Sequence, residues 1–291
     1  MKACPHCNKL IVETAVRCKY CRRPVSTYSR KPSVLSRIKK IAATNPEKER
    51  PPWSITEVII LWALTFLASL AFEHYNTVAL VMGFLRKHYF ILIKEPAFQM
   101  HLSVFAGTFL LKLSAVLAIW AILIFHKAGF LSALKLKGPV KKEWLWLFPA
   151  FFVFTVVCRF IADTDPLSPN LPVYLFFRDS SIVGTAFTLF SLMIVAPVSE
   201  EIFFRGFIYP GIQKRLGLGM AVLITTFLFT AVHVPQCMEH PFIIFMIFSG
   251  GLLLTLVRAF TGSTLMAVLL HALYNTTIVA AGFVKFLIFK Y

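Results

Sequence analysis

Two adjacent glutamates and an arginine stand in an apolar stretch of the sequence. Glu200, Glu201 and Arg205 follow a run of apolar residues, and ionisable groups in such surroundings are costly and usually functional. Glu201 and Arg205 are four residues apart, so they share one helix face at ion-pairing distance. Glu200 is rotated by about 100° from Glu201 on an ideal helix. We therefore expect Glu200 to lack this partner and to be a candidate general base for water.

The residues just before the glutamates allow two interpretations of this segment. Pro197 removes one backbone hydrogen bond and should kink a membrane helix. Alternatively, Ser199 caps a helix at the membrane surface, and both glutamates sit in solvent in its first turn. Polar residues in later apolar segments weaken the second interpretation.

Two further apolar segments carry histidine at helical spacing. Phe229 lies four residues before His233, and His271 lies four residues before Asn275, so each pair shares a helix face. A single histidine of this kind is more often a packing residue than a catalyst. Counted from the cytoplasmic helix ends at about 1.5 Å per residue, Glu200, His271 and His233 lie at roughly 15, 14 and 22 Å. Helix tilt can absorb the difference, so we expect the polar side chains to face one cavity.

Four cysteines near the N-terminus form two CxxC pairs with ten residues between them. Cys4, Cys7, Cys18 and Cys21 have the spacing of a zinc ribbon, in which four thiolates bind one Zn²⁺. So small a module would be unfolded without metal. Disulfides are the alternative, but they need an oxidising compartment, and the basic flanks favour the cytoplasm. His6 could replace a thiol as a ligand.

The composition indicates what positions these residues. The chain has 291 residues, of which 58% are hydrophobic and 15% are charged, and a soluble domain has about 25% charged residues. We predict an all-α fold, a polytopic membrane helical bundle with seven or eight transmembrane helices and a small N-terminal zinc-ribbon module. The seven predicted helices are Ile55–Phe72, Leu102–Phe125, Trp144–Ala162, Ile182–Tyr209, Gly219–Val234, Phe242–Arg258 and Thr264–Gly282.

The segment Val78–Ile93 decides between seven and eight helices. It is apolar but contains three consecutive basic residues, Arg86 to His88. The loop Lys127–Lys142 has five lysines and no acid, so it should lie on the same side as the basic leader, with an even number of crossings between them. We therefore expect Val78–Ile93 to lie in the membrane interface. The N-terminus is predicted to be cytoplasmic, at a bacterial cytoplasmic membrane.

The positive charge is concentrated in the leader. The formal net charge is +17, and residues 1–53 hold 13 Lys and Arg against three Glu. An anionic lipid surface explains this excess better than nucleic acid does. We predict three parts: a zinc ribbon over residues 1–25, a basic linker over 26–53 and a transmembrane domain over 54–291.

Together the motifs resemble those of a known family. EExxxR at Glu200–Arg205, FxxxH at Phe229–His233 and HxxxN at His271–Asn275 resemble the signature of the CPBP family. This family comprises the CAAX prenyl proteases of the Ras-converting type and the bacterial Abi proteins, which are glutamate-type intramembrane endopeptidases. The resemblance covers roughly Ile182 to Gly282, and it does not include the cysteine-rich leader.

The resemblance also implies roles for the motif residues. It implies that Glu200 activates the hydrolytic water and that His233 helps to hold this water. It further implies that His271 and Asn275 stabilise the oxyanion of the tetrahedral intermediate. The residues implied as supporting are Glu201, Arg205 and Phe229. No cofactor is expected at the peptidase centre, and the zinc belongs to the ribbon.

The predicted function is hydrolysis of a peptide bond in a membrane-associated peptide or protein, either prenylated or a leader peptide. A metal-dependent intramembrane peptidase is the nearest alternative, because Glu200, His233 and His271 can bind metal although HExxH is absent. A non-catalytic membrane scaffold or immunity protein, or a transporter, is the alternative from another class. The sequence shows no inverted repeat that would favour a transporter.

Overall fold

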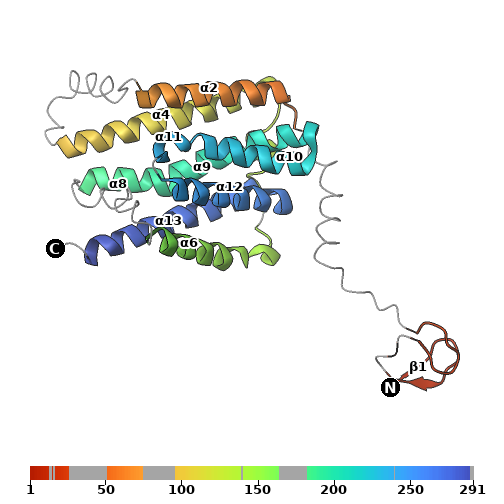
Figure 1. The fold of residues 1–291 in the computed structure, drawn as a ribbon. Coiled ribbons are helices and arrows are strands. Elements are labelled where there is room, and N and C mark those ends of the chain that lie inside the picture. Colours follow the sequence, from red (N-terminus) through yellow and green to blue (C-terminus); the bar gives the residue numbers. More distant parts are fainter. Residues whose placement is uncertain are drawn as a thin grey trace. The chain divides into compact units, whose positions relative to one another are not determined.

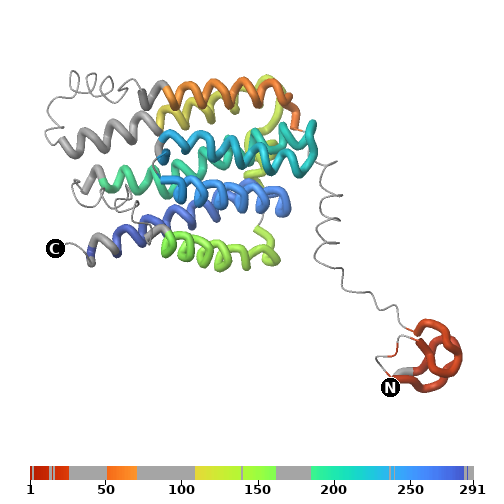
Figure 2. Tube along the Cα trace, viewed as in Figure 1, coloured from red at the N-terminus to blue at the C-terminus, as the bar shows by residue number. Residues whose placement is uncertain are grey.

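The computed structural model describes residues 1–12, 15, 17–25, 51–74, 96–138, 140–163, 182–238 and 240–288, and Figure 2 traces the chain. The chain forms two compact units, Met1–Asn45 and Pro46–Tyr291. The predicted interfacial segment Val78–Ile93 and residues 26–50 of the predicted linker lie outside the described residues.

The N-terminal unit is a small hairpin with a core of cysteines. Strands β1 (Lys2–Ala3) and β2 (Leu10–Ile11) pair antiparallel, and an isolated bridge joins Arg17 to Pro24. Its buried side chains are Cys4, Ile11 and Cys18. Modules with so little buried apolar surface usually need metals, disulfides or oligomerisation for stability.

The second unit is a bundle of helices (Figure 1). All-α architecture is therefore confirmed, and each of the seven predicted helices has a counterpart. The elements are α2 (Ile55–His74), α4 (Pro96–Phe125), α5 (Phe130–Ala133), η1 (Lys142–Trp144), α6 (Leu147–Asp163), α8 (Ile182–Phe190), η2 (Ser191–Val195), α9 (Ala196–Glu201), η3 (Ile202–Ile208), α10 (Tyr209–Ala231), α11 (Val234–Cys237), α12 (Pro241–Thr261) and α13 (Thr264–Ile288).

Four helical stretches among the described residues are long and apolar enough to cross a membrane. They are Lys142–Ile161, Thr185–Ala231, Pro241–Thr261 and Thr264–Val284, and the shorter apolar helices are Ile55–Leu70 and Phe109–Phe125. The stretch Thr185–Ala231 contains two predicted helices, which Gly217 separates with a non-helical backbone (φ 77°, ψ 176°). The chain is thus a membrane protein, and its number of crossings stays a prediction.

Several helix ends follow from local sequence signals. Ser54 and Glu57 form a capping box before α2, with Ser54 N–H donating to Glu57 Oε2 over 2.7 Å and Glu57 N–H donating to Ser54 Oγ over 3.3 Å. Gly262 ends α12 in the left-handed conformation, with φ 68°. Several predicted ends were wrong: α4 begins at Pro96 rather than Leu102, α13 extends to Ile288 rather than Gly282, and α10 ends at Ala231 rather than Val234.

The segment formed by α9 and η3 is largely buried in the bundle. In Figure 1, α2 lies beside α4, and α6 lies beside α13. The short α9 packs against both α4 and α13. Its two glutamates are therefore surrounded by other helices rather than exposed at a helix start, which contradicts the alternative in which Ser199 caps a surface helix.

Two π-helical turns, η2 and η3, flank α9. Pro197 lies in the first turn of α9, directly after η2, so the predicted distortion takes the form of a widened turn. Each π-helical turn offers one backbone carbonyl to a distant side chain. Trp53 Nε1 donates to Phe207 O over 3.0 Å, and Asn275 Nδ2 donates to Leu192 O over 2.7 Å. The widened turns thus anchor the glutamate helix to two other segments.

Candidate active site

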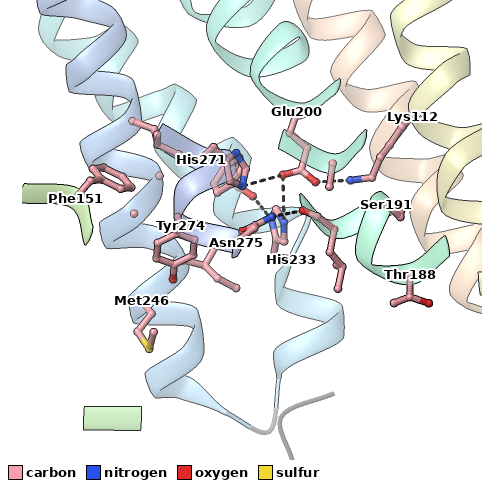
Figure 3. Close-up of a pocket in the computed structure, with 17 residues that line it drawn as sticks. Lys112, Phe151, Thr188, Ser191, Glu200, His233, Met246, His271, Tyr274 and Asn275 are labelled. Carbon is pink, nitrogen blue, oxygen red and sulfur yellow. Dashed lines mark hydrogen bonds and ion pairs between the residues drawn. The ribbon is translucent and has the colours of Figure 1, made fainter. Parts of the chain in front are cut away.

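A cavity of about 320 Å³ is lined by residues from all three predicted motifs. Figure 3 shows these side chains pointing toward one another. Glu200 comes from α9, His233 follows α10, and His271 comes from α13. The predicted residues on its wall are Glu200, Phe229, His233, His271 and Asn275, and its apolar wall includes Phe151, Met246, Leu254 and Tyr274.

Both histidines face the same oxygen of Glu200. His233 Nε2 and His271 Nε2 each lie 3.9 Å from Glu200 Oε2. This separation is too long for a direct hydrogen bond. A single water molecule about 2.8 Å from each atom would span it. The three atoms therefore define a place where one water can be held against a carboxylate.

The opposite nitrogen of each imidazole ring is already bound. His233 Nδ1–H donates to the carbonyl oxygen of Phe229 over 2.8 Å, which leaves Nε2 of the neutral ring as an acceptor. His271 Nδ1 lies 2.8 Å from Glu201 Oε1. With Nδ1–H donated to that carboxylate, His271 Nε2 is a donor only when the ring carries both protons. The two histidines are thus fixed in orientation but differ in what they can offer.

Glu201 is the buried centre of the polar network. Its Oε1 lies 2.9 Å from Arg205 Nη1 and 2.8 Å from His271 Nδ1, and both Glu201 and Arg205 are 0% exposed. The predicted ion pair between Glu201 and Arg205 is present. The contact between Glu201 and His271 was not predicted, because the two residues are 70 positions apart.

The Arg205 guanidinium is held on several sides. It donates to Gly251 O over 2.8 Å and to Thr255 Oγ1 over 3.2 Å, both on α12, and its Cζ lies 4.3 Å from the Phe229 ring centroid. A Cβ at Gly251 would lie 2.8 Å from Phe229 Cδ1. Glycine is therefore needed where α12 passes Phe229, and this close approach lets the Gly251 carbonyl reach Arg205.

Lys112 on α4 is the functional candidate that the sequence reasoning missed. Its Nζ forms an ion pair with Glu200 Oε1. Glu200 thus lacks Arg205, which is bound to Glu201, but it has a charged partner on another helix. Figure 3 shows Glu200 between Lys112 and the two histidines. A lysine in the apolar run Leu102–Phe125 was itself the available signal, because ionisable groups in membrane helices are usually functional.

The four predicted zinc ligands come together in the N-terminal unit. The sulfur atoms of Cys4, Cys7, Cys18 and Cys21 all lie within 4.8 Å of one another, and all four are free thiols. Four ligands about 2.3 Å from one zinc ion would have sulfur atoms roughly 3.8 Å apart. The Cys4–Cys21 and Cys7–Cys18 pairs are 3.7 and 3.6 Å apart. The cluster can therefore bind a tetrahedral metal ion.

The two CxxC segments share one backbone hydrogen bond in equivalent positions. Asn8 N–H donates to Cys4 O, and Arg22 N–H donates to Cys18 O, each over 2.8 Å. A hydrogen bond from the backbone of Cys21 is the main reason why the pKa of the Cys18 thiol is lowered to about 6. The lower pKa favours the thiolate. His6 instead has its Nε2 3.1 Å from Pro24 O and is outside the cysteine cluster.

Comparison with known proteins supports the resemblance drawn from the motifs. Residues 182–277 match a family model described as type II CAAX prenyl endopeptidase Rce1-like. The match contains all three motifs and leaves out the cysteine-rich leader. The resemblance to the CAAX protease family is therefore confirmed for this segment.

A relative and the solved structures add little about activity. A protein of Escherichia coli described as an uncharacterized 24.3 kDa protein is 30% identical over 128 residues, which are 43% of this chain. The chain spans 58% of the length of that protein. No solved structure matches the chain.

Replacing Glu201 by Gln should destabilise the bundle. The substitution keeps the side-chain size but leaves the buried Arg205 without its charged partner, and breaking such a pair costs about 3 kcal/mol or more. We expect a lower thermal unfolding midpoint in detergent than for Glu200→Gln, the matched control, because the Lys112 partner of Glu200 is 22% exposed. Equal midpoints for the two variants would show that the Glu201 pair does not stabilise the fold.

Proposed function

From the match of residues 182–277 to the Rce1-like family, we propose that this chain is an intramembrane endopeptidase in which Glu200 activates water. One observation supports this most strongly. Glu200, His233 and His271 line the same cavity, and Nε2 of each histidine lies 3.9 Å from Glu200 Oε2. A carboxylate base and two fixed ring nitrogens around a site for one water molecule suit hydrolysis of an amide bond.

The proposed reaction uses the residues of the cavity in order. Glu200 takes a proton from the water, whose oxygen attacks the carbonyl carbon of the scissile peptide bond, while His233 Nε2 accepts the second water hydrogen bond. His271, with both ring nitrogens protonated, donates its Nε2–H to the oxyanion. Asn275 donates its second amide hydrogen, since it uses only one hydrogen on Leu192 O. The intermediate then expels the amine, which receives the proton from Glu200.

A metal-dependent peptidase is the nearest alternative. It is favoured by the way Phe229 O and Glu201 hold the two Nδ1 atoms, because metal-bound histidines are usually fixed in this manner. The charges favour the metal-free mechanism. Lys112 is paired with Glu200 and Arg205 with Glu201, so a divalent cation would have to share Glu200 with an ammonium group.

The substrate in this proposal is a membrane-associated peptide or protein. The apolar wall of the cavity suits a peptide that enters from the bilayer rather than from water. Both a prenylated C-terminal peptide and a leader peptide satisfy this chemistry. The bacterial cytoplasmic membrane and a cytoplasmic N-terminus belong to the same proposal, supported by the basic leader.

The N-terminal module in this proposal is a structural zinc ribbon. The sulfur–sulfur distances of 3.6 and 3.7 Å suit a tetrahedral zinc site. Its hairpin buries too little apolar surface to fold by itself. Zinc would therefore supply the folding free energy of this unit, and it would take no part in peptide hydrolysis.

Glu200→Gln should abolish peptide hydrolysis while the protein still folds and inserts. The amide has the size of the carboxyl group but cannot accept the proton from water. The test is comparative proteomics of cells that produce the wild type or the variant, in which processing of at least one membrane-associated peptide should disappear. Glu143→Gln, with a side chain that is 67% exposed, is the matched control. The proposal would be contradicted if Glu200→Gln retained more than a few per cent of wild-type hydrolysis, or if it lost hydrolysis and kept full biological function.

His271→Ala and Asn275→Ala should lower kcat far more than they raise KM, because the oxyanion exists only in the transition state. Each substitution is expected to lower kcat roughly 100- to 1000-fold, and the loss in the double variant should be smaller than the product of the two single losses. Measuring kcat, KM and metal content of the wild type, the two single variants and the double variant separates the mechanisms. Loss of activity together with metal from the membrane unit in His271→Ala, with little effect of Asn275→Ala, would support a metal centre instead.

Replacing Cys4 and Cys7 by Ser should release one zinc ion per chain and leave the peptidase centre intact. Two thiolates are too few for a structural zinc site. Elemental analysis of the purified full chain, together with peptidase assays, provides the measurement. Cys158→Ser, outside the cluster, should keep its zinc. A zinc-free wild-type protein under reducing conditions would rule out the ribbon.

A further inference from the structure

We infer that Lys112 is a positioning residue for Glu200, which holds one carboxylate oxygen so that the other faces the two histidines. Lys112 Nζ pairs with Oε1 of Glu200, and His233 and His271 face Oε2. The two oxygens are thus used for different purposes. This inference deepens the proposed function and rests on it.

The surroundings of Glu200 leave this task to Lys112. From the neighbouring elements, Lys112 on α4, His233 after α10 and His271 on α13 face the carboxylate. On its own helical segment, Arg205 is bound to Glu201. Among the described residues, Lys112 is therefore the lysine or arginine side chain that forms an ion pair with Glu200. A positive charge in contact with a carboxylate favours its ionised form, and this form can act as a base.

Lys112 also stands at the boundary between two cavities. It lines the cavity of about 320 Å³ and a second one of about 120 Å³. The walls of the second cavity come from α2, α4 and the segment around α9, and include Thr65, Leu111, Ala115, Phe203 and Phe204. Glu200 and His233 line both cavities. Lys112 therefore approaches the carboxylate from the side of α4, opposite the proposed water.

This arrangement predicts a particular kinetic effect. Without the ammonium group, the Glu200 carboxylate is free to rotate and to take up a proton at higher pH. Both changes reduce the fraction of enzyme that can activate water, and neither changes the apolar walls that contact the substrate. Removal of Lys112 should therefore lower kcat with little effect on KM, and the conservative cation Arg should restore part of the rate.

The first test compares Lys112→Met, Lys112→Arg and the control Lys141→Met, whose lysine is 67% exposed. We expect Lys112→Met to lose at least about tenfold in kcat and to lose activity at a higher pH than the wild type, by about one unit or more. Lys112→Arg should recover part of the rate, and Lys141→Met should match the wild type. A wild-type kcat and pH profile in Lys112→Met would overturn the inference and leave the proposed function standing. A wild type without peptidase activity would overturn both.

A second measurement does not depend on activity. Infrared difference spectra between each protein and its Glu200→Gln counterpart report the protonated carboxyl group of residue 200 during a pH titration. In Lys112→Met this band should appear at a pH about one unit or more above that of the wild type. An identical titration in both proteins would show that Lys112 does not control the charge of Glu200, whatever the substrate is.

Discussion

The buried charge of Glu201 is the constraint on which the site depends. A carboxylate that is 0% exposed needs both a counter-charge and hydrogen bonds. Arg205 supplies the charge over 2.9 Å, and His271 supplies a further bond over 2.8 Å from α13. Arg205 then reaches the backbone and side chain of α12 through Gly251 and Thr255. The contacts of one carboxylate oxygen, Glu201 Oε1, therefore connect three segments of the bundle and set the direction of the His271 ring.

The neighbouring carboxylate can be reactive because Glu201 carries the structural task. On a helix the next residue points about 100° away, so Glu200 faces the cavity while Glu201 faces the core. The flanking π-helical turns hold this helix through their carbonyls, which accept bonds from Trp53 and Asn275. Adjacent residues of the same type are thus placed in different surroundings. The local backbone and the charges of Lys112 and Arg205 together separate their roles.

Spacing within one helix was predictable from the sequence, whereas contacts between helices were not. The interval of four residues predicted the Glu201–Arg205 pair, and apolar runs predicted seven helices that all have counterparts. The Lys112–Glu200 and Glu201–His271 contacts join residues 88 and 70 positions apart. The helical spacing within one segment cannot predict such pairs, because they depend on how the helices are rotated when they pack. The ends at Pro96 and Ile288 were also missed, and both helices continue beyond the apolar stretches that predicted them.

The central claim is that Glu200 acts as a base on water and does not attack the peptide itself. A single turnover in H₂¹⁸O, with enzyme in excess over a peptide whose processing requires Glu200, tests this claim by mass spectrometry of product and enzyme. If water attacks directly, the new product carboxyl group carries one ¹⁸O atom and residue 200 carries none. Appearance of ¹⁸O in the Glu200 side chain after the first turnover, with an unlabelled product, would indicate an acyl-enzyme intermediate and contradict the account.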